Sequence, residues 1–89
     1  MKLYSRFHIR VKNGKEFRRT TISIETLLVD MFLIKLGKNS GHSDIRSWLQ
    51  EKQDEQNMSY ADSALLKSAL MMEIIDPKLV DKYYKRKGD

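Results

Sequence analysis

The chain has 89 residues, of which 40% are hydrophobic and 33% are charged, and it contains no cysteine. This length fits one small domain, residues 1 to 89, and the composition argues against a disordered chain, a coiled-coil rod and a membrane protein. Without cysteine the chain has no disulfide, thiolate metal site or cysteine nucleophile. Its first residues lack the apolar core of a signal peptide, so we expect a cytoplasmic protein with no membrane partner.

Positive charge is concentrated at both ends of the sequence, and the formal net charge is +5. Residues 1 to 19 contain seven basic residues and one acidic residue, whereas residues 20 to 76 contain five basic and nine acidic residues. Residues 77 to 89 are basic again, with five basic and two acidic residues. Two basic ends around an acidic middle are typical of a protein that contacts a polyanion, although an ordinary solvated surface has the same composition.

Residues 1 to 24 are predicted to form a β-hairpin or ribbon. Apolar and polar residues alternate through the first half of this segment, and a period of two indicates a half-buried strand. Asn13-Gly14 then predicts a two-residue type I′ turn, which would place Ile9 opposite Arg18. One face of the hairpin is mostly apolar. The other face carries cations, aromatic rings and hydroxyls, which suit phosphates and base edges or simply solvent.

Three to four helices are predicted to follow, in a helical body over residues 25 to 84. The segment from Glu25 to Leu36 is apolar nearly all round, and after Thr26 only Asp30 and Lys35 interrupt it. A chain of this size can hardly surround such a helix alone. We therefore expect an intertwined homodimer of the α+β class, with this helix in the dimer core.

Local signals mark the later helices. His42 or Ser43 is expected as the N-cap of the second helix, and Ser59 has the capping-box spacing that starts a third helix. Asp76-Pro77 stops that helix and starts a last short element, because proline is tolerated at the first helical position. The apolar side chains of this element are expected to dock on the body. A basic tail, residues 85 to 89, would contact phosphates through Lys85, Arg86 and Lys87.

Catalytic and metal motifs are missing from the sequence. His8 and His42 are the only histidines, and they have no partners at metal-ligand spacing. The sequence contains no glycine-rich phosphate loop, nucleophile elbow or His-Glu metal motif. We therefore expect no enzyme activity, no catalytic residue, no metal site, and no cofactor or small-molecule ligand.

Residues 18 to 25 read Arg-Arg-Thr-Thr-Ile-Ser-Ile-Glu, and an apolar helix, a glycine-bearing turn and the run Gly-His-Ser-Asp-Ile-Arg at 41 to 46 follow. Over about residues 18 to 56 the chain thereby resembles the ribbon-helix-helix repressors. In that family two copies of the strand pair across a twofold axis, and the ribbon enters the major groove of DNA. The resemblance implies that Arg19, Thr21 and Ser23 point toward bases and that backbone N–H groups at His42 and Ser43 meet a phosphate.

The sequence departs from the family pattern in three places. The turn over residues 37 to 43 is longer than the usual connection, and the spacing from Ser43 to the following Ile-Arg is one residue tighter. A hairpin precedes the strand and competes for one of its edges, and helices are added after Ser59. The strand over residues 18 to 24 could therefore pair within its own chain or with a second copy.

These observations predict a small basic DNA-binding protein, either a transcriptional repressor or a plasmid or phage accessory factor, that binds double-stranded DNA as a homodimer. Besides the residues named above, the hairpin contributes four candidate DNA contacts: Arg6, His8, Arg10 and Lys12. The alternative is a protein-interaction module that inhibits a host protein, since residues 27 to 36 and 65 to 75 form nearly continuous apolar surfaces. Solution mass and salt-dependent retention on heparin distinguish the two.

Overall fold

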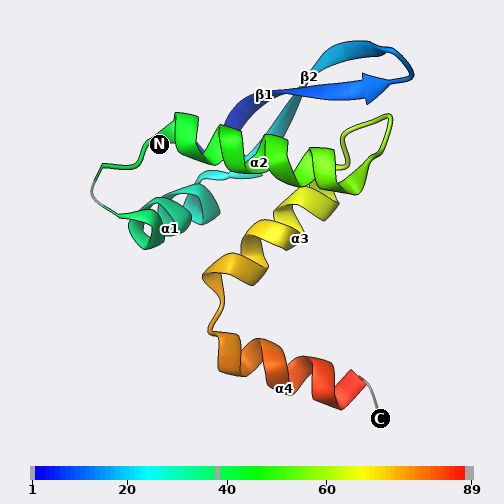
Figure 1. Cartoon of the computed structure of the whole chain (residues 1–89). Coiled ribbons are helices and arrows are strands. Elements are labelled where there is room, and N and C mark those ends of the chain that lie inside the picture. The colour runs from blue at the N-terminus through cyan, green and yellow to red at the C-terminus, as the bar shows by residue number, and fades with distance from the viewer. Residues whose placement is uncertain (1, 38, 88–89) are drawn as a thin grey trace.

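The structure is a computed structural model that describes residues 2–37 and 39–87. In these residues an N-terminal hairpin precedes four helices, so the expected α+β fold is confirmed (Figure 1). The elements in chain order are β1 (Tyr4–Asn13), β2 (Glu16–Glu25), α1 (Thr26–Leu36), α2 (His42–Gln56), α3 (Ser63–Ile74) and α4 (Pro77–Lys87).

The two strands pair antiparallel within the chain, in a register that differs from the predicted one by two residues. Ile9 lies opposite Thr20 and not Arg18. The turn consists of Gly14 and Lys15, one residue later than predicted. Of these two turn residues only Gly14 has a positive φ, 67°, which is the pattern of a type II′ turn with glycine at its first central position. Because side chains alternate with a period of two, this shift leaves every side chain on its predicted face.

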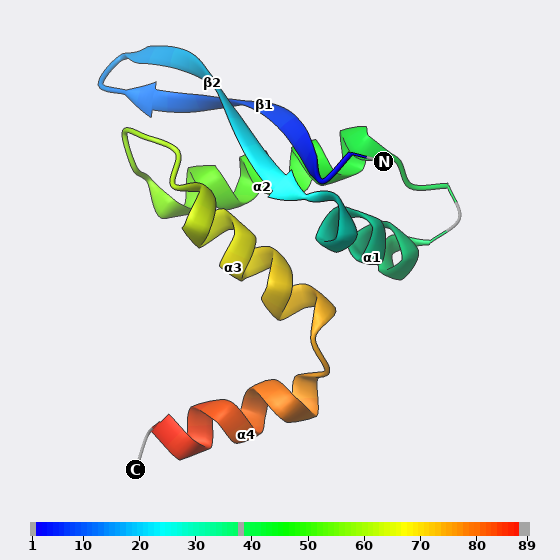
Figure 2. The ribbon, with the colours of Figure 1, turned by 180° about the vertical axis from the view of Figure 1, so that it is seen from behind.

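The apolar inner face of the hairpin packs on α1, α2 and α3, which lie on the same side of it in Figures 1 and 2. A two-stranded hairpin is marginal alone in water, so the helices are needed to bury this face. The buried core consists of Phe7, Ile9, Ile22, Ile24, Val29, Phe32, Ile45, Leu49, Leu66 and Leu70.

The second helix begins one position away from the predicted caps. Gly41, and neither His42 nor Ser43, is the N-cap of α2. The Asp44 carboxylate accepts the Gly41 N–H at 2.7 Å, so an acidic side chain of the helix itself satisfies a donor at its start. At the other end of α2, Asn57 takes the left-handed conformation (φ 52°), which asparagine adopts more readily than most residues.

The third helix begins later than predicted, and the fourth begins as predicted. Asp62, and not Ser59, caps α3, and its Oδ1 atom accepts the N–H of Ala64 at 3.0 Å. Asp76 caps α4 through a 2.9 Å hydrogen bond from the N–H of Lys78 to Oδ1. The Asp-Pro pair therefore acts as a helix stop and restart.

Helix α1 is buried on one side only in the single chain. Val29 and Phe32 belong to the core. Leu27 and Ile34 are 69% and 81% exposed, and Met31 is exposed between them. These three residues share one face, because they are spaced four and three positions apart. Phe32 packs in the core of its own chain, so a Phe32→Asp substitution would unfold the protomer. Such a variant could therefore not be used to test whether α1 forms a dimer interface.

Helix α4 extends away from the rest of the molecule, as both views of the ribbon show (Figures 1 and 2). Its apolar side chains Leu79, Tyr83 and Tyr84 are exposed, so the expected docking of this element on the body is wrong. Lys85 and Arg86 are exposed in its last turn, and α4 ends at the third predicted tail residue, Lys87, whose side chain lies outside the described part.

A search of the described residues for membrane-spanning segments found no helix with the length and apolar character that crossing a bilayer requires.

An ion pair joins the end of the hairpin to α3. The Lys67 ammonium lies 2.9 Å from the Glu25 carboxylate, with both side chains partly exposed. The hydrogen bond from Lys67, supported by a backbone hydrogen bond, holds the pKa of the Glu25 carboxyl below its ordinary value. The carboxylate form is therefore favoured more strongly in the folded chain than in the unfolded chain.

This pKa predicts an acid-sensitive contribution to stability. A lowered folded-state pKa stabilises the protein fully above the unfolded value of about 4.3, and the gain disappears as pH falls through the folded value. In Lys67→Met the Glu25 pKa should rise toward normal, and stability should depend less on pH below about pH 4.3. Carboxyl-detected NMR titration and urea unfolding measure both quantities. Lys52→Met, which removes the ion pair with Glu55 on α2, is the control. An unchanged Glu25 pKa in Lys67→Met would contradict the assignment.

Candidate nucleic-acid interface

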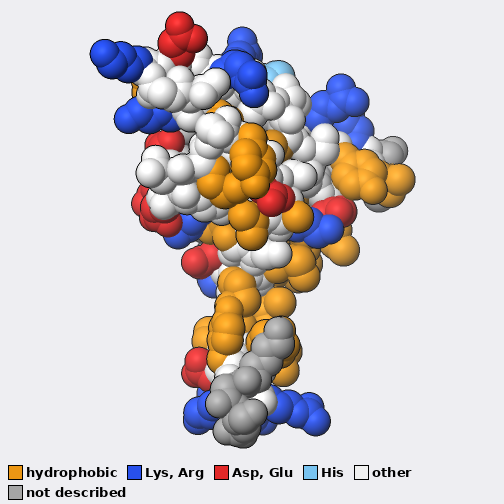
Figure 3. Space-filling model, turned by 90° about the vertical axis from the view of Figure 1, so that its right-hand side faces the viewer, with side chains coloured by type: hydrophobic (Ala, Val, Ile, Leu, Met, Phe, Trp, Pro, Cys, Tyr) orange, Lys and Arg blue, Asp and Glu red, His pale blue; other side chains and the backbone are white. Residues whose placement is uncertain are grey.

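The outer face of the hairpin is exposed and rich in cations. Lys and Arg side chains gather around the hairpin at the top of Figure 3. The alternation of the strands places all seven predicted hairpin residues on this face, together with two aromatic residues. Its exposed members are Tyr4, Arg6, His8, Arg10, Lys12, Phe17, Arg19, Thr21 and Ser23.

Cross-strand neighbours on this face differ in how they interact. His8 Nδ1 lies 2.9 Å from the Thr21 hydroxyl, so these two side chains hold each other. Arg10 and Arg19 lie directly opposite each other as like charges. Within residues 2–37 and 39–87, the ion pairs are formed by lysines elsewhere, and neither arginine has a carboxylate partner. Like charges in this position destabilise a hairpin unless an anion lies between them.

Helix α2 runs alongside β1 and covers its outer edge at Arg10. The side chain of Gln50 accepts the Arg10 N–H through Oε1 and donates to the Arg10 carbonyl through Nε2, both at 2.8 Å. The amide therefore satisfies backbone groups as a neighbouring strand would. Because these groups face away from β2, Arg10 and Arg19 form a non-hydrogen-bonded pair, the kind whose side chains approach more closely.

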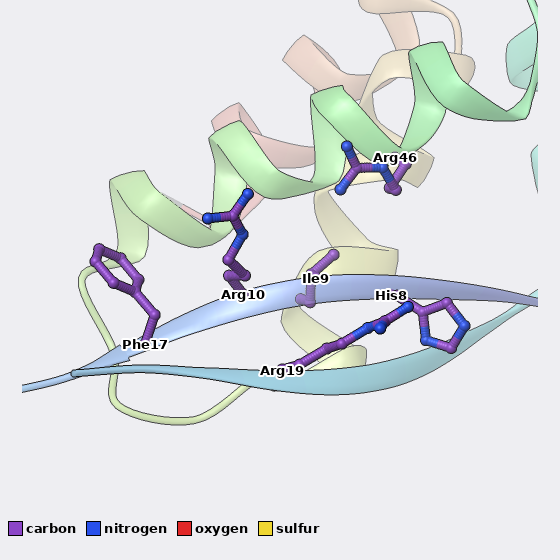
Figure 4. A pocket seen from close by; sticks show the side chains of 6 residues that line it. All are labelled: His8, Ile9, Arg10, Phe17, Arg19 and Arg46. Carbon is purple, nitrogen blue, oxygen red and sulfur yellow. The ribbon is translucent and has the colours of Figure 1, made fainter.

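A third arginine joins this pair from α2. Arg10, Arg19 and Arg46 line a hollow of about 440 Å³ together with His8, Ile9 and Phe17 (Figure 4). In Figure 4, Arg10 points toward α2, Arg46 projects from α2 beside it, and Arg19 extends along the sheet toward His8. Two strands and one helix thus each contribute one arginine to the lining of this hollow.

Sequence reasoning did not identify Arg46 as a site residue. It stands four positions after His42 and four before Gln50, so the three side chains form one stripe along α2. That spacing is the signal that could have found Arg46. Placing the stripe beside β1 requires the tertiary structure.

His42 lies near the hairpin at the beginning of α2. Its ring centroid is 5.5 Å from that of Phe7, and it lines a second hollow, of about 600 Å³, with Arg6. Ser43 is exposed next to it. The Asp44 carboxylate accepts a backbone N–H at this helix start, which places negative charge where the resemblance puts a phosphate. At this helix start the His42 side chain is therefore better suited to anion binding than the backbone N–H groups are.

The basic end of α4 is separated from this face. Lys85 and Arg86 lie on the helix that extends from the opposite end of the molecule (Figures 1 and 2). In a single chain the structure brings the hairpin residues, His42 and Arg46 together and leaves α4 apart from them.

The chemistry of the face suits a polyanion with aromatic bases. Guanidinium groups bind phosphate oxygens or guanine edges with paired N–H donors. Phe17, 65% exposed at the rim of the hollow, offers a ring on which a base can stack. In the described parts of the chain, no three His, Asp or Glu side chains gather closely enough to hold a metal ion.

Comparisons with known proteins add no assignment. No protein-family model matches the chain, and no similar protein was found among the curated proteins or the solved structures. The interpretation of the site therefore depends on its geometry and charge.

The Arg10–Arg19 pair predicts a substitution that increases stability. Arg19→Thr should raise the free energy of unfolding by about 0.2 to 1 kcal/mol at low salt, because it removes a repulsion between directly opposed like charges. The gain should shrink at high salt as the charges are screened. Urea unfolding at two salt concentrations measures it. Arg18→Thr is the matched control, since Arg18 lies opposite Val11. Equal effects of the two substitutions would show that the pair carries no strain.

Proposed function

We propose that the outer face of the hairpin, together with Arg46, binds double-stranded DNA. The observation that carries this proposal is the cluster of Arg10, Arg19 and Arg46 around one hollow, without carboxylate partners in the described residues. A hollow lined by charges of one sign raises the local potential and concentrates ions of the opposite sign. The phosphates of nucleic acid supply that charge, and the aromatic and hydroxyl groups nearby suit its bases.

The shape of the hairpin favours duplex DNA. A two-stranded ribbon fits the major groove, where each base pair presents a distinct pattern of donors and acceptors. Arg19, Thr21 and Ser23 occupy alternate positions of β2 on the outer face, as the resemblance to ribbon-helix-helix repressors implies for base-reading residues. Arg6, Lys12 and the α2 stripe flank them and would contact phosphates.

A homodimeric repressor or a plasmid or phage accessory factor is the form of DNA-binding protein that we propose. The ribbon-helix-helix resemblance implies that β2 of one copy pairs with β2 of another. Gln50 occupies the outer edge of β1 at Arg10, whereas the other edge of β2 has no paired strand within residues 2–37 and 39–87. Unpaired strand edges favour pairing with a second chain. The cysteine-free sequence agrees with a cytoplasmic location.

A protein-interaction module remains the second candidate, because α1 and α4 expose apolar side chains. Leu27 and Ile34 on α1 and Leu79 on α4 are each more than half exposed. A host-protein inhibitor would use these helices, and it would neither bind DNA nor be retained on heparin.

The first prediction for DNA concerns charge. Affinity should fall linearly with the logarithm of salt concentration, with a slope of about −0.9 for each phosphate contact. Arg46→Ala should reduce the magnitude of that slope by about 0.9 and weaken preferred and random duplexes about equally. Fluorescence anisotropy between 50 and 200 mM salt, the range in which such proteins respond strongly, measures the slope. The control is Lys52→Ala, whose ammonium lies over the Trp48 ring on α2. Affinity that does not change with salt would refute phosphate binding.

The second prediction concerns sequence reading by Arg19. Selection from a randomised duplex pool should recover a preferred site, on which Arg19→Ala costs about 1 to 3 kcal/mol while binding to random DNA changes little. Lys12→Ala should weaken both about equally. Arg18→Ala is the matched control on the same strand. If no sequence is enriched, or if Arg19→Ala keeps full discrimination, the hairpin binds DNA without reading it.

A further inference from the structure

The last helix, α4, is an amphipathic arm that needs a partner surface. Isolated helices shorter than about 12 to 15 residues are marginal in water, and α4 has 11 residues. Leu79 and Tyr84 are 59% and 56% exposed, and with Val80 and Tyr83 they lie on one face. Figure 3 shows hydrophobic side chains along the narrow part of the molecule that α4 forms. Packing of this face would stabilise the helix.

The link before α4 directs the arm away from its own α1. Ile75 is extended (φ −71°, ψ 146°), and Asp76 caps the new helix with its side chain. The Asp76 carbonyl also accepts the N–H groups of Leu79 and Val80, at 3.0 and 3.1 Å. Pro77 disfavours the helical conformation of Asp76, the residue before it, so α3 cannot continue smoothly into α4. In both ribbon views the arm points into solvent (Figures 1 and 2).

The exposed face of α1 has the features that the arm requires. Leu27, Met31 and Ile34 form an apolar stripe about two turns long. Asp30 borders one flank of the stripe and Lys35 borders the other. Asp30 has no cation within ion-pair distance in the part of the chain that the structure describes.

Charges on the arm complement those of α1 in one orientation. At 3.6 residues per turn, Lys82 and Arg86 border one flank of the apolar face of α4, and Asp81 borders the other. Each helix has two flanks, which are told apart by looking along the helix from its N-terminus. When two helices pack antiparallel, the clockwise flank of one helix meets the clockwise flank of the other. Asp30 then faces Lys82. Lys35, whose ammonium lies 4.0 Å from the Glu73 carboxylate of its own chain, borders the turn that holds Asp81. Parallel packing would instead bring like charges together on both sides.

We propose that α4 of one copy packs antiparallel on the α1 stripe of a second copy, and that the second copy returns the same contact. This exchange of arms is isologous, which means that both copies use the same two surfaces. The α4 helix of each copy therefore covers the α1 stripe of the other. Ile34 then lies near Leu79 of the other copy, and Leu27 lies near its Tyr84. The proposal does not depend on DNA binding, and either can fail without the other.

Disulfide trapping tests the arrangement in the full chain, which has no cysteine of its own. Ile34→Cys combined with Leu79→Cys should form a covalent dimer in a glutathione redox buffer. Leu27→Cys combined with Leu79→Cys, which matches parallel packing, is the control and should crosslink at least fivefold more slowly. All three positions are exposed, so the variants should fold, and circular dichroism checks this. Wild-type sedimentation should give a dimer at tens of micromolar.

The ionic contact is tested by reversing charges. Asp30→Lys should raise the dimer Kd by about threefold to tenfold, since an exposed pair contributes little but occurs twice. Adding Lys82→Asp should restore the wild-type Kd. A disulfide within one chain would overturn the proposal, because the arm would then close on its own α1. Equal trapping of both cysteine pairs would also overturn it. So would a monomeric wild type together with no covalent dimer from the Ile34→Cys, Leu79→Cys variant.

Discussion

Burial of the inner face of the hairpin is the contact on which the rest of the structure depends. Two strands cannot form a stable sheet in water unless other elements cover their apolar side. Here Phe7, Ile9, Ile22 and Ile24 pack on three helices and form the upper layer of the only extended core cluster within the described residues. Since alternation fixes the faces, burying these residues necessarily places Arg6, Arg10 and Arg19, which occupy the alternate positions of the two strands, on the exposed face. The cationic surface is therefore the direct counterpart of the core.

The position of α2 beside β1 converts this exposed face into a defined site. Ile45 and Leu49 pack in the core, and Gln50 fixes the position of α2 along β1 through two hydrogen bonds to the Arg10 backbone. One turn before Gln50, Arg46 is thereby held beside the hairpin. The same contacts that stabilise the fold thus bring like charges together, and their repulsion is a local cost that a bound anion would remove.

Features with a local cause could be predicted from the sequence, whereas those set by tertiary contacts could not. Alternation predicted the hairpin and its faces correctly, and the helix stop and restart at Asp76-Pro77 was also predicted correctly. The turn was misplaced by one residue because Asn13-Gly14 and Gly14-Lys15 both supply a glycine at a central position. Arg46 was missed because its place beside the hairpin depends on where α2 lies. The exposed stripe of α1 could not be located, since nearly every residue there is apolar.

Mapping the contact surface in solution tests the central claim most directly. Addition of a short DNA duplex to the isotope-labelled protein at low salt should shift the NMR amide signals of both strands and of residues 42 to 46. Signals of α3, which lies on the other side of the core, should change little. Shifts confined to α1 and α4, with the signals of Arg10 and Arg19 unchanged, would contradict a nucleic-acid interface on the hairpin.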